Sequence, residues 1–259
     1  MQKYENKVLH VDVSDGKANY SQRNNQYIHK NKKGMIDVQG STMCNVTSIC
    51  MALDYNGWQF PKGPFAQPED NLCKFLMESK EVDEYYKKVS PNLYKDYKDC
   101  KTKTVGNKVV LDYYTPNEIH LVLAYATNLW LKSDADSYSD TVDIFDIINE
   151  LLEGRSCVIS GNFNGLGHIV TLVGCEWNVD SPKSNVYDLI KFICEKKVLP
   201  NRFIIDDPYG KWNAAKGYAS GESGNNSLLT RDEFMKMIKP ENNQKVKRCH
   251  KIKLGSALV

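Results

Sequence analysis

The sequence predicts an α+β chain, in which helices come first and antiparallel strands follow. Up to about residue 153, apolar residues recur at helical spacing, whereas beyond it they form short runs bounded by Gly, Pro or Asn. No β-α-β alternation and no internal repeat is visible in the sequence. With 259 residues, 41% of them apolar, the chain is long enough to bury a substantial core.

The helical half begins after a polar stretch, residues 1–40, which we interpret as an N-terminal arm packing on the core. Residues 41–259 then form the main domain. A helix is predicted from Cys44, because apolar residues recur at helical spacing as far as Leu53 and Gly57 follows as a stop signal.

Residues 58–140 are interpreted as a helical insertion that shapes specificity. A Pro/Gly-rich turn leads to an amphipathic helix near 69–89, followed by a loop rich in Lys and Tyr. The segment Thr115–Glu118 reads as a capping box with Pro at the first helical position, and it predicts a helix through about Leu131.

The remaining elements are a helix at about 141–153, which Gly154 ends, and a series of strands. The strand segments are SCVISGNF (156–163), HIVTLVGCEW (168–177), RFIIDDP (202–208) and VKRCHKIKL (246–254). A polar loop at about 213–228 and a capped helix at Thr230 separate the last two strands.

Charge gives no general attraction to nucleic acid or to a membrane surface. The 34 basic residues nearly cancel the 32 acidic ones. The segment EYYKKVSPNLYKDYKDCKTK (84–103) could stack single-stranded bases, but its interleaved acids favour a solvated face or a groove for an extended substrate. We therefore expect no nucleic-acid partner.

The chain shows neither a signal peptide nor an apolar run of the roughly 20 residues that a membrane span needs. We expect it to be made in the cytoplasm, without a membrane span. Its eight cysteines lack C-x-x-C spacing and are expected to be reduced thiols. Only Cys249 and His250 are adjacent, without a second ligand pair at zinc-site spacing, so we expect no metal and no cofactor.

Cys44 is the first candidate for chemistry, because it stands where the arm meets the predicted helix. The free N–H groups and the positive end of a helix favour a thiolate at that position. A buried, inert cysteine is the alternative interpretation for any single Cys.

His168 opens an apolar strand directly after the turn NGLGH, whose glycines leave room for a substrate backbone. A surface histidine at a turn is the alternative. Asp206 and Asp207 end the strand RFII before Pro208, and only one of them can share the face of His168; an Asp-Pro pair can also simply start a turn. Together, a thiol, an imidazole and a carboxylate supply a nucleophile, a proton acceptor and a group that orients the acceptor.

Three segments carry a resemblance to a known family. GSTMCNVTSICMALDYNGW resembles the nucleophile helix of bacteriocin-processing-type papain-like peptidases and their free-standing bacterial and phage relatives, with C-G-P-T-S or C-N-V-T-S followed by M-x-L-x-Y-x-G. GLGHIVTLVG resembles the family's G-H-x-V-x-V-x-G strand, and FIIDDPYGKW resembles its I-x-D-P-Y-G segment. The resemblance spans roughly residues 20–212, although nothing between 58 and 140 contributes to it.

The resemblance implies a papain-like fold, with an N-terminal nucleophile helix packed on an antiparallel β-sheet. It implies that Cys44 is the nucleophile, His168 the base and Asp207, the Asp before Pro, the orienting group. The family also carries an oxyanion-binding glutamine before the cysteine. Gln22, in ANYSQRNNQY, resembles the family's Y-x-S-Q segment and is favoured over Gln39, which is nearer to Cys44.

The resemblance further implies a cysteine hydrolase that cleaves amide bonds. Because the C-N-V-T-S form belongs to the phage-like branch, we expect peptidoglycan stem or cross-link peptides as substrates of an endolysin-like thiol protease, released by lysis or carried in a phage particle. An intracellular cysteine protease, an acyltransferase on protein substrates and a non-catalytic phage structural module of the same fold are the alternatives. The sequence leaves the oligomeric state open.

Overall fold

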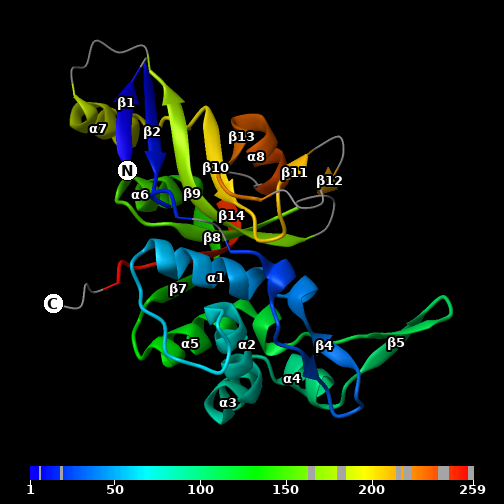
Figure 1. Ribbon diagram of the computed structural model, residues 1–259. Coiled ribbons are helices and arrows are strands. Elements are labelled where there is room, and N and C mark those ends of the chain that lie inside the picture. Colours follow the sequence, from blue (N-terminus) through cyan, green and yellow to red (C-terminus); the bar gives the residue numbers. More distant parts are fainter. Residues whose placement is uncertain are drawn as a thin grey trace.

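The computed structural model (Figure 1) combines helices with antiparallel sheets, as the sequence predicts. It describes residues 1–5, 7–17, 20–162, 167–179, 185–213, 217–218, 223–238 and 245–255. Most of the glycine-rich turn before His168, at 163–166, lies outside the described residues.

The described helices and strands have the following bounds. The α-helices are α1 (Cys44–Tyr55), α2 (Pro68–Glu78), α3 (Lys80–Val89), α4 (Pro91–Lys98), α5 (His120–Leu131), α6 (Ile144–Leu152), α7 (Val186–Lys196) and α8 (Arg231–Ile238). The 3-10 turns are η1 (Gln22–Asn24), η2 (Gly40–Thr42) and η3 (Pro116–Glu118). The strands are β1 (Gln2–Glu5), β2 (Val8–Asp12), β3 (His29–Lys30), β4 (Ile36–Val38), β5 (Thr102–Val105), β6 (Lys108–Leu111), β7 (Asp136–Asp143), β8 (Cys157–Gly161), β9 (His168–Asn178), β10 (Arg202–Asp206), β11 (Trp212–Asn213), β12 (Gly217–Tyr218), β13 (Ser227–Thr230) and β14 (Lys245–Ile252).

Strand β9 is the centre of the main sheet. Along the sheet the order is β1-β2-β9-β8-β14-β7, and β10 pairs with both β9 and β13. The first half of β9 pairs with β8 and its second half with β2. Because β10 runs antiparallel to β9, with Asp206 opposite Thr171, the end of β10 lies beside the beginning of β9.

Apolar residues are buried on both faces of this sheet, and they form two hydrophobic cores. Helix α1 contributes side chains to both cores. Alternate residues of a strand face opposite sides, and here Val158 and Ile169 pack with residues of α1 to α5, whereas Ile159 and Val170 pack with α6. Figure 1 shows α1 between the main sheet and the group of helices α2 to α5. Helix α1 is therefore held on both sides.

The helix that begins at Cys44 lies where the sequence predicts it, but the single helix expected near 69–89 is wrong. The chain breaks at Ser79, whose ψ of 129° is extended, and its hydroxyl caps α3 by accepting from Val82 N at 3.4 Å. A serine that offers its hydroxyl to the backbone favours a helix start over a helix interior.

The predicted capping box at Thr115 is present, with Thr115 N donating to Glu118 Oε2 at 2.7 Å, but it opens η3, and α5 begins only at His120. The helix expected at about 141–153 is α6, which begins at Ile144 because β7 extends to Asp143. The sequence of β7, DSYSDTVD, is largely polar because the strand lies at an edge of the main sheet, and its composition therefore does not indicate a strand. Within the loop expected at 213–228, β11 pairs with β12; residues 214–216 and 219–222 lie outside the described residues. Among the helices that the structure describes, none is both long and apolar enough to cross a membrane.

Candidate active site

Three candidate side chains from separate elements meet at one end of β9. Cys44 is the first residue of α1, His168 the first of β9, and Asp207 directly follows β10. His168 Nε2 lies 2.7 Å from Asp207 Oδ1, and the Cys44 thiol forms a hydrogen bond with the same imidazole. The structure therefore brings together a thiol, an imidazole and a carboxylate in that order.

Helix α1 is tied to β9 one turn beyond the thiol. Ser48 Oγ donates to Ile169 O at 3.2 Å, and Thr171 Oγ1 donates to Ser48 O at 3.0 Å. Ser48 and Thr171 are fully buried, so both bonds are shielded from water. This reciprocal pair fixes the beginning of α1 relative to His168.

The Asp207 carboxylate is buried, 1% exposed, and held by two further donors. The backbone N–H of Tyr209 donates to Oδ1 at 2.8 Å, and the hydroxyl of Tyr218 donates to Oδ2 at 2.8 Å. Tyr218 lies in the segment that the sequence predicts as a polar loop, and no motif there indicates its contact with Asp207. A buried carboxylate with these donors is fixed in orientation and remains a good acceptor for His168.

The imidazole is favoured in its protonated form. Burial opposes a charge on the ring, but the hydrogen bonds to Asp207 and Cys44, and the charges of both, outweigh burial and raise the pKa of His168 to about 10. The imidazolium form of His168 is therefore favoured at neutral pH.

Asp206 points away from this group, because consecutive strand residues face opposite sides. Its Oδ2 accepts from the hydroxyl of Tyr55 at 2.6 Å, and its Oδ1 accepts from the backbone N–H of Asn226 at 2.5 Å. Burial raises the pKa of Asp206 to about 6. Of the two neighbouring carboxylates, only Asp207 contacts His168 among the described contacts.

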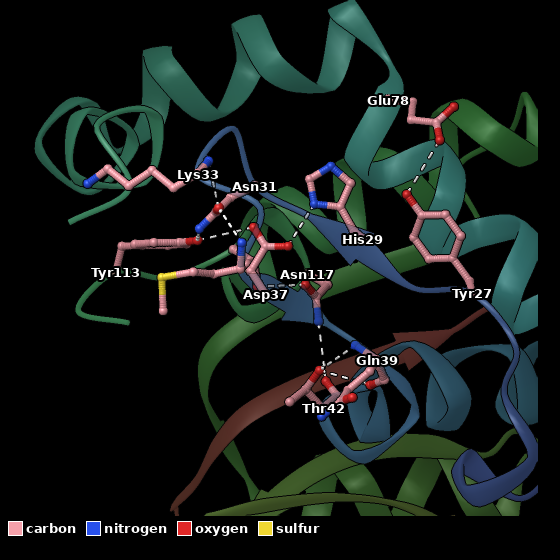
Figure 2. A network of polar contacts seen from close by, with 12 residues as sticks. Tyr27, His29, Asn31, Lys33, Asp37, Gln39, Thr42, Glu78, Tyr113 and Asn117 are labelled. Carbon is pink, nitrogen blue, oxygen red and sulfur yellow. Dashed lines mark hydrogen bonds and ion pairs between the residues drawn. The ribbon is translucent and has the colours of Figure 1, made fainter. Parts of the chain in front are cut away.

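Both candidate oxyanion glutamines lie at the turn before Cys44. Gln22 is buried, and its Nε2 donates to the carbonyls of Gly40 at 3.1 Å and Ser41 at 3.2 Å. Its Oε1 is buried without a hydrogen-bond partner among the described residues. Gln39 is exposed and precedes η2 as its N-cap residue, where its backbone N–H donates to Thr42 Oγ1 at 3.2 Å (Figure 2).

The turn before Cys44 is also braced by η3. Figure 2 shows Asn117, on η3, directed at Thr42, and its Nδ2 donates to Thr42 O at 3.4 Å. The Nδ2 of Asn45 donates in turn to the carbonyl of Asn117. Asn117 and Asn45 are buried, 0% and 5% exposed, so segment 115–118 supports both sides of the nucleophile candidate.

Asn117→Ala is expected to lower the free energy of unfolding by about 2 kcal/mol, because it removes the buried hydrogen bonds that the Asn117 amide forms with Thr42 O, Asn45 Oδ1 and the Thr115 hydroxyl. Urea denaturation measures this change. Asn92→Ala, at an exposed position on α4, is the matched control and is expected to have little effect. Equal stabilities of the two variants would contradict the bracing role of Asn117.

Among the described residues, no group of three or more His, Cys, Asp and Glu side chains is arranged to hold a metal ion.

The family model described as the Peptidase_C39 like family matches residues 18–226, which is well over half of the chain. Searches of curated proteins and of solved structures found no match. The matched span contains all three segments that carry the resemblance seen in the sequence. The chain therefore belongs to the Peptidase_C39 like family, which makes it a member of a cysteine peptidase family.

Proposed function

We propose that this protein is a papain-like cysteine hydrolase of amide bonds, with Cys44 as nucleophile, His168 as base and Asp207 as the group that orients the imidazole. The observation that carries the proposal is the contact of one imidazole with both Cys44 and Asp207, at 2.7 Å from the latter. A thiol, a base and an orienting carboxylate within hydrogen-bond reach are the requirements of thiol catalysis.

The reaction follows from this arrangement. The Cys44 thiolate attacks the substrate carbonyl, and a C–S bond forms. As the C–N bond breaks, the His168 imidazolium gives its proton to the leaving nitrogen, and an acyl-enzyme remains. The neutral imidazole then takes a proton from water as the water oxygen attacks the thioester. The C–S bond breaks, the carboxylic acid is released, and the Cys44 thiolate and the His168 imidazolium are restored.

For the oxyanion, the proposal uses the backbone N–H of Cys44 together with Gln22. The first N–H groups of a helix have no partner within the helix, so the N–H of Cys44 is suited to this role. Gln22 lies against the turn before Cys44, where its side-chain amide donates to two backbone carbonyls. On substrate binding, one of these two hydrogen bonds would be replaced by a hydrogen bond to the substrate oxygen.

In this proposal α1 is the nucleophile helix and packs on the antiparallel sheet, as in a papain-like fold. Residues 41–259 form the catalytic domain, residues 1–40 are an arm that packs on it, and residues 58–140 are an insertion. The hydrogen bond from Asn117 to Thr42 supports a role of the insertion in positioning the turn before the nucleophile.

We propose peptidoglycan stem or cross-link peptides as the substrate. The C-N-V-T-S form of the segment after Met43 supports this choice, because it resembles the phage-like branch. Such an enzyme would be made in the cytoplasm, then released by lysis or carried in a phage particle. All eight cysteines are free thiols, and this favours a second candidate, a protease or acyltransferase that acts on proteins in a reducing compartment.

Mass spectrometry of digested sacculi separates these candidates. We expect the enzyme to create new amino and carboxyl termini in the stem peptides or cross-bridges. Added amines would form amide products if acyl transfer competes with hydrolysis. Sacculi that stay intact, with enzyme whose Cys44 reacts rapidly with an alkylating probe, would rule out the wall substrate and point to a protein.

A further inference from the structure

Arg23 lies at the edge of the candidate site without an acidic partner. It follows the buried Gln22 on η1, and its side chain is exposed. Among the described residues, no carboxylate forms an ion pair with its guanidinium. The carboxylate of Asp207, two residues before Tyr209 in the chain, is already engaged by His168 and Tyr218.

The guanidinium is held in place by an aromatic ring. Arg23 Cζ lies 4.4 Å from the centroid of the Tyr209 ring. The backbone beneath the two side chains is joined as well, because Gln22 N donates to Pro208 O at 2.9 Å. Stacking on a ring occupies the face of a guanidinium and leaves its N–H edge available.

Tyr209 in turn packs against the catalytic imidazole. The rings of Tyr209 and His168 meet edge to face, with centroids 6.3 Å apart and an interplanar angle of 82°. Tyr218 also contacts Tyr209, with 4.8 Å between the ring centroids. One aromatic ring therefore separates the Arg23 cation from His168.

The position of His168 indicates which fragment of a bound substrate lies beside Arg23. In the proposed reaction His168 donates its proton to the leaving nitrogen, so the amine-side fragment lies beside His168 and Tyr209. A guanidinium edge beyond Tyr209 therefore faces the amine-side fragment. Arginine binds carboxylates through paired N–H groups, and such charge-assisted bonds are among the stronger hydrogen bonds.

We infer that Arg23 forms a carboxylate-binding subsite for the amine-side fragment of the substrate. This inference rests on the proposed function and narrows its substrate class to peptides with an acidic side chain or a free α-carboxylate just beyond the scissile bond. The subsite selects substrates; Arg23 does not contact the reacting atoms.

The first test is the cleavage of a peptide library by the wild-type enzyme, Arg23→Gln and Arg23→Lys. The wild type is expected to prefer Asp, Glu or a free carboxylate on the amine side of the cut. For matched acid and amide peptides, the ratio of kcat/KM should fall about tenfold in Arg23→Gln and less in Arg23→Lys. Arg202→Gln, which removes the same charge at the far end of β10, is the matched control and should keep the ratio.

The second test needs no turnover. Iodoacetylglycine and iodoacetylglycinamide both alkylate Cys44, but only the first carries a carboxylate. The ratio of their rate constants is expected to fall in Arg23→Gln and to stay at the wild-type value in Arg202→Gln. A wild type without acidic preference, or unchanged ratios in Arg23→Gln, would overturn the subsite. Cleavage that survives Cys44→Ala would instead overturn the proposed function, so the two failures are distinguishable.

Discussion

Cys44→Ala and His168→Ala are each expected to abolish amide-bond cleavage, with a loss in kcat/KM on the order of 10⁴-fold or more. The two side chains act as one unit, because the thiol is useful only with the imidazole beside it. Removal of either one is therefore expected to cost nearly as much as removal of both. Steady-state kinetics on a cleaved peptide, or on digested wall material, measures the loss.

Two controls separate lost chemistry from lost structure. Thermal unfolding of both variants is expected to stay close to that of the wild type, since neither change opens a deep cavity in the two cores. Cys194→Ala removes an exposed thiol on α7 and should keep full activity. Substantial activity in Cys44→Ala would show that a different group attacks the substrate.

Asp207→Asn is expected to lower kcat by about 10²- to 10⁴-fold, which is less than the loss on removing Cys44. An amide keeps much of the geometry around His168 but carries no charge. The pKa of His168, raised to about 10 by Asp207 and Cys44, is then expected to fall. Because acylation needs the imidazolium, activity of the wild type should decline only as the pH rises toward 10. In Asp207→Asn, this decline in activity should occur at a lower pH.

Asp206→Asn is the matched control for this prediction. Its carboxylate contacts Tyr55 and Asn226 rather than His168, so the variant should change stability more than the pH profile. Burial raises the pKa of Asp206 to about 6, so folding disfavours its charged form. Its contribution to stability is therefore fully present below about pH 4 and is lost as the pH rises through 6. A large activity loss in Asp206→Asn with none in Asp207→Asn would reverse the assignment of the two carboxylates.

The elements that position the candidate site could be predicted from the sequence because each carries a strong local signal. The helix from Cys44 has apolar residues at helical spacing and a glycine stop, and the strand from His168 is a long apolar run. Alternation along β10 limits the choice to one of two aspartates, and the resemblance to the family selects Asp207. The family match confirms that resemblance.

The parts that could not be predicted depend on contacts between distant segments. Tyr218 holds Asp207 from a stretch whose composition predicts only a loop. Asn117 reaches Thr42 across 75 residues of sequence, and neither residue is unusual in its own segment. Strand β7 is polar because it lies at a sheet edge, so its strand character depends on pairing with β14. The local hydrophobic pattern of a segment does not predict pairing between strands that are distant in the sequence.

The catalytic role of Cys44 is tested most directly by the rate at which each cysteine is alkylated, measured by peptide mapping across a range of pH. We predict that Cys44 reacts much faster than the exposed Cys194 at neutral pH, and that His168→Ala removes the difference. Reaction of Cys44 no faster than Cys194 in the wild type would contradict its role as an activated nucleophile, and would leave a scaffold without catalytic function.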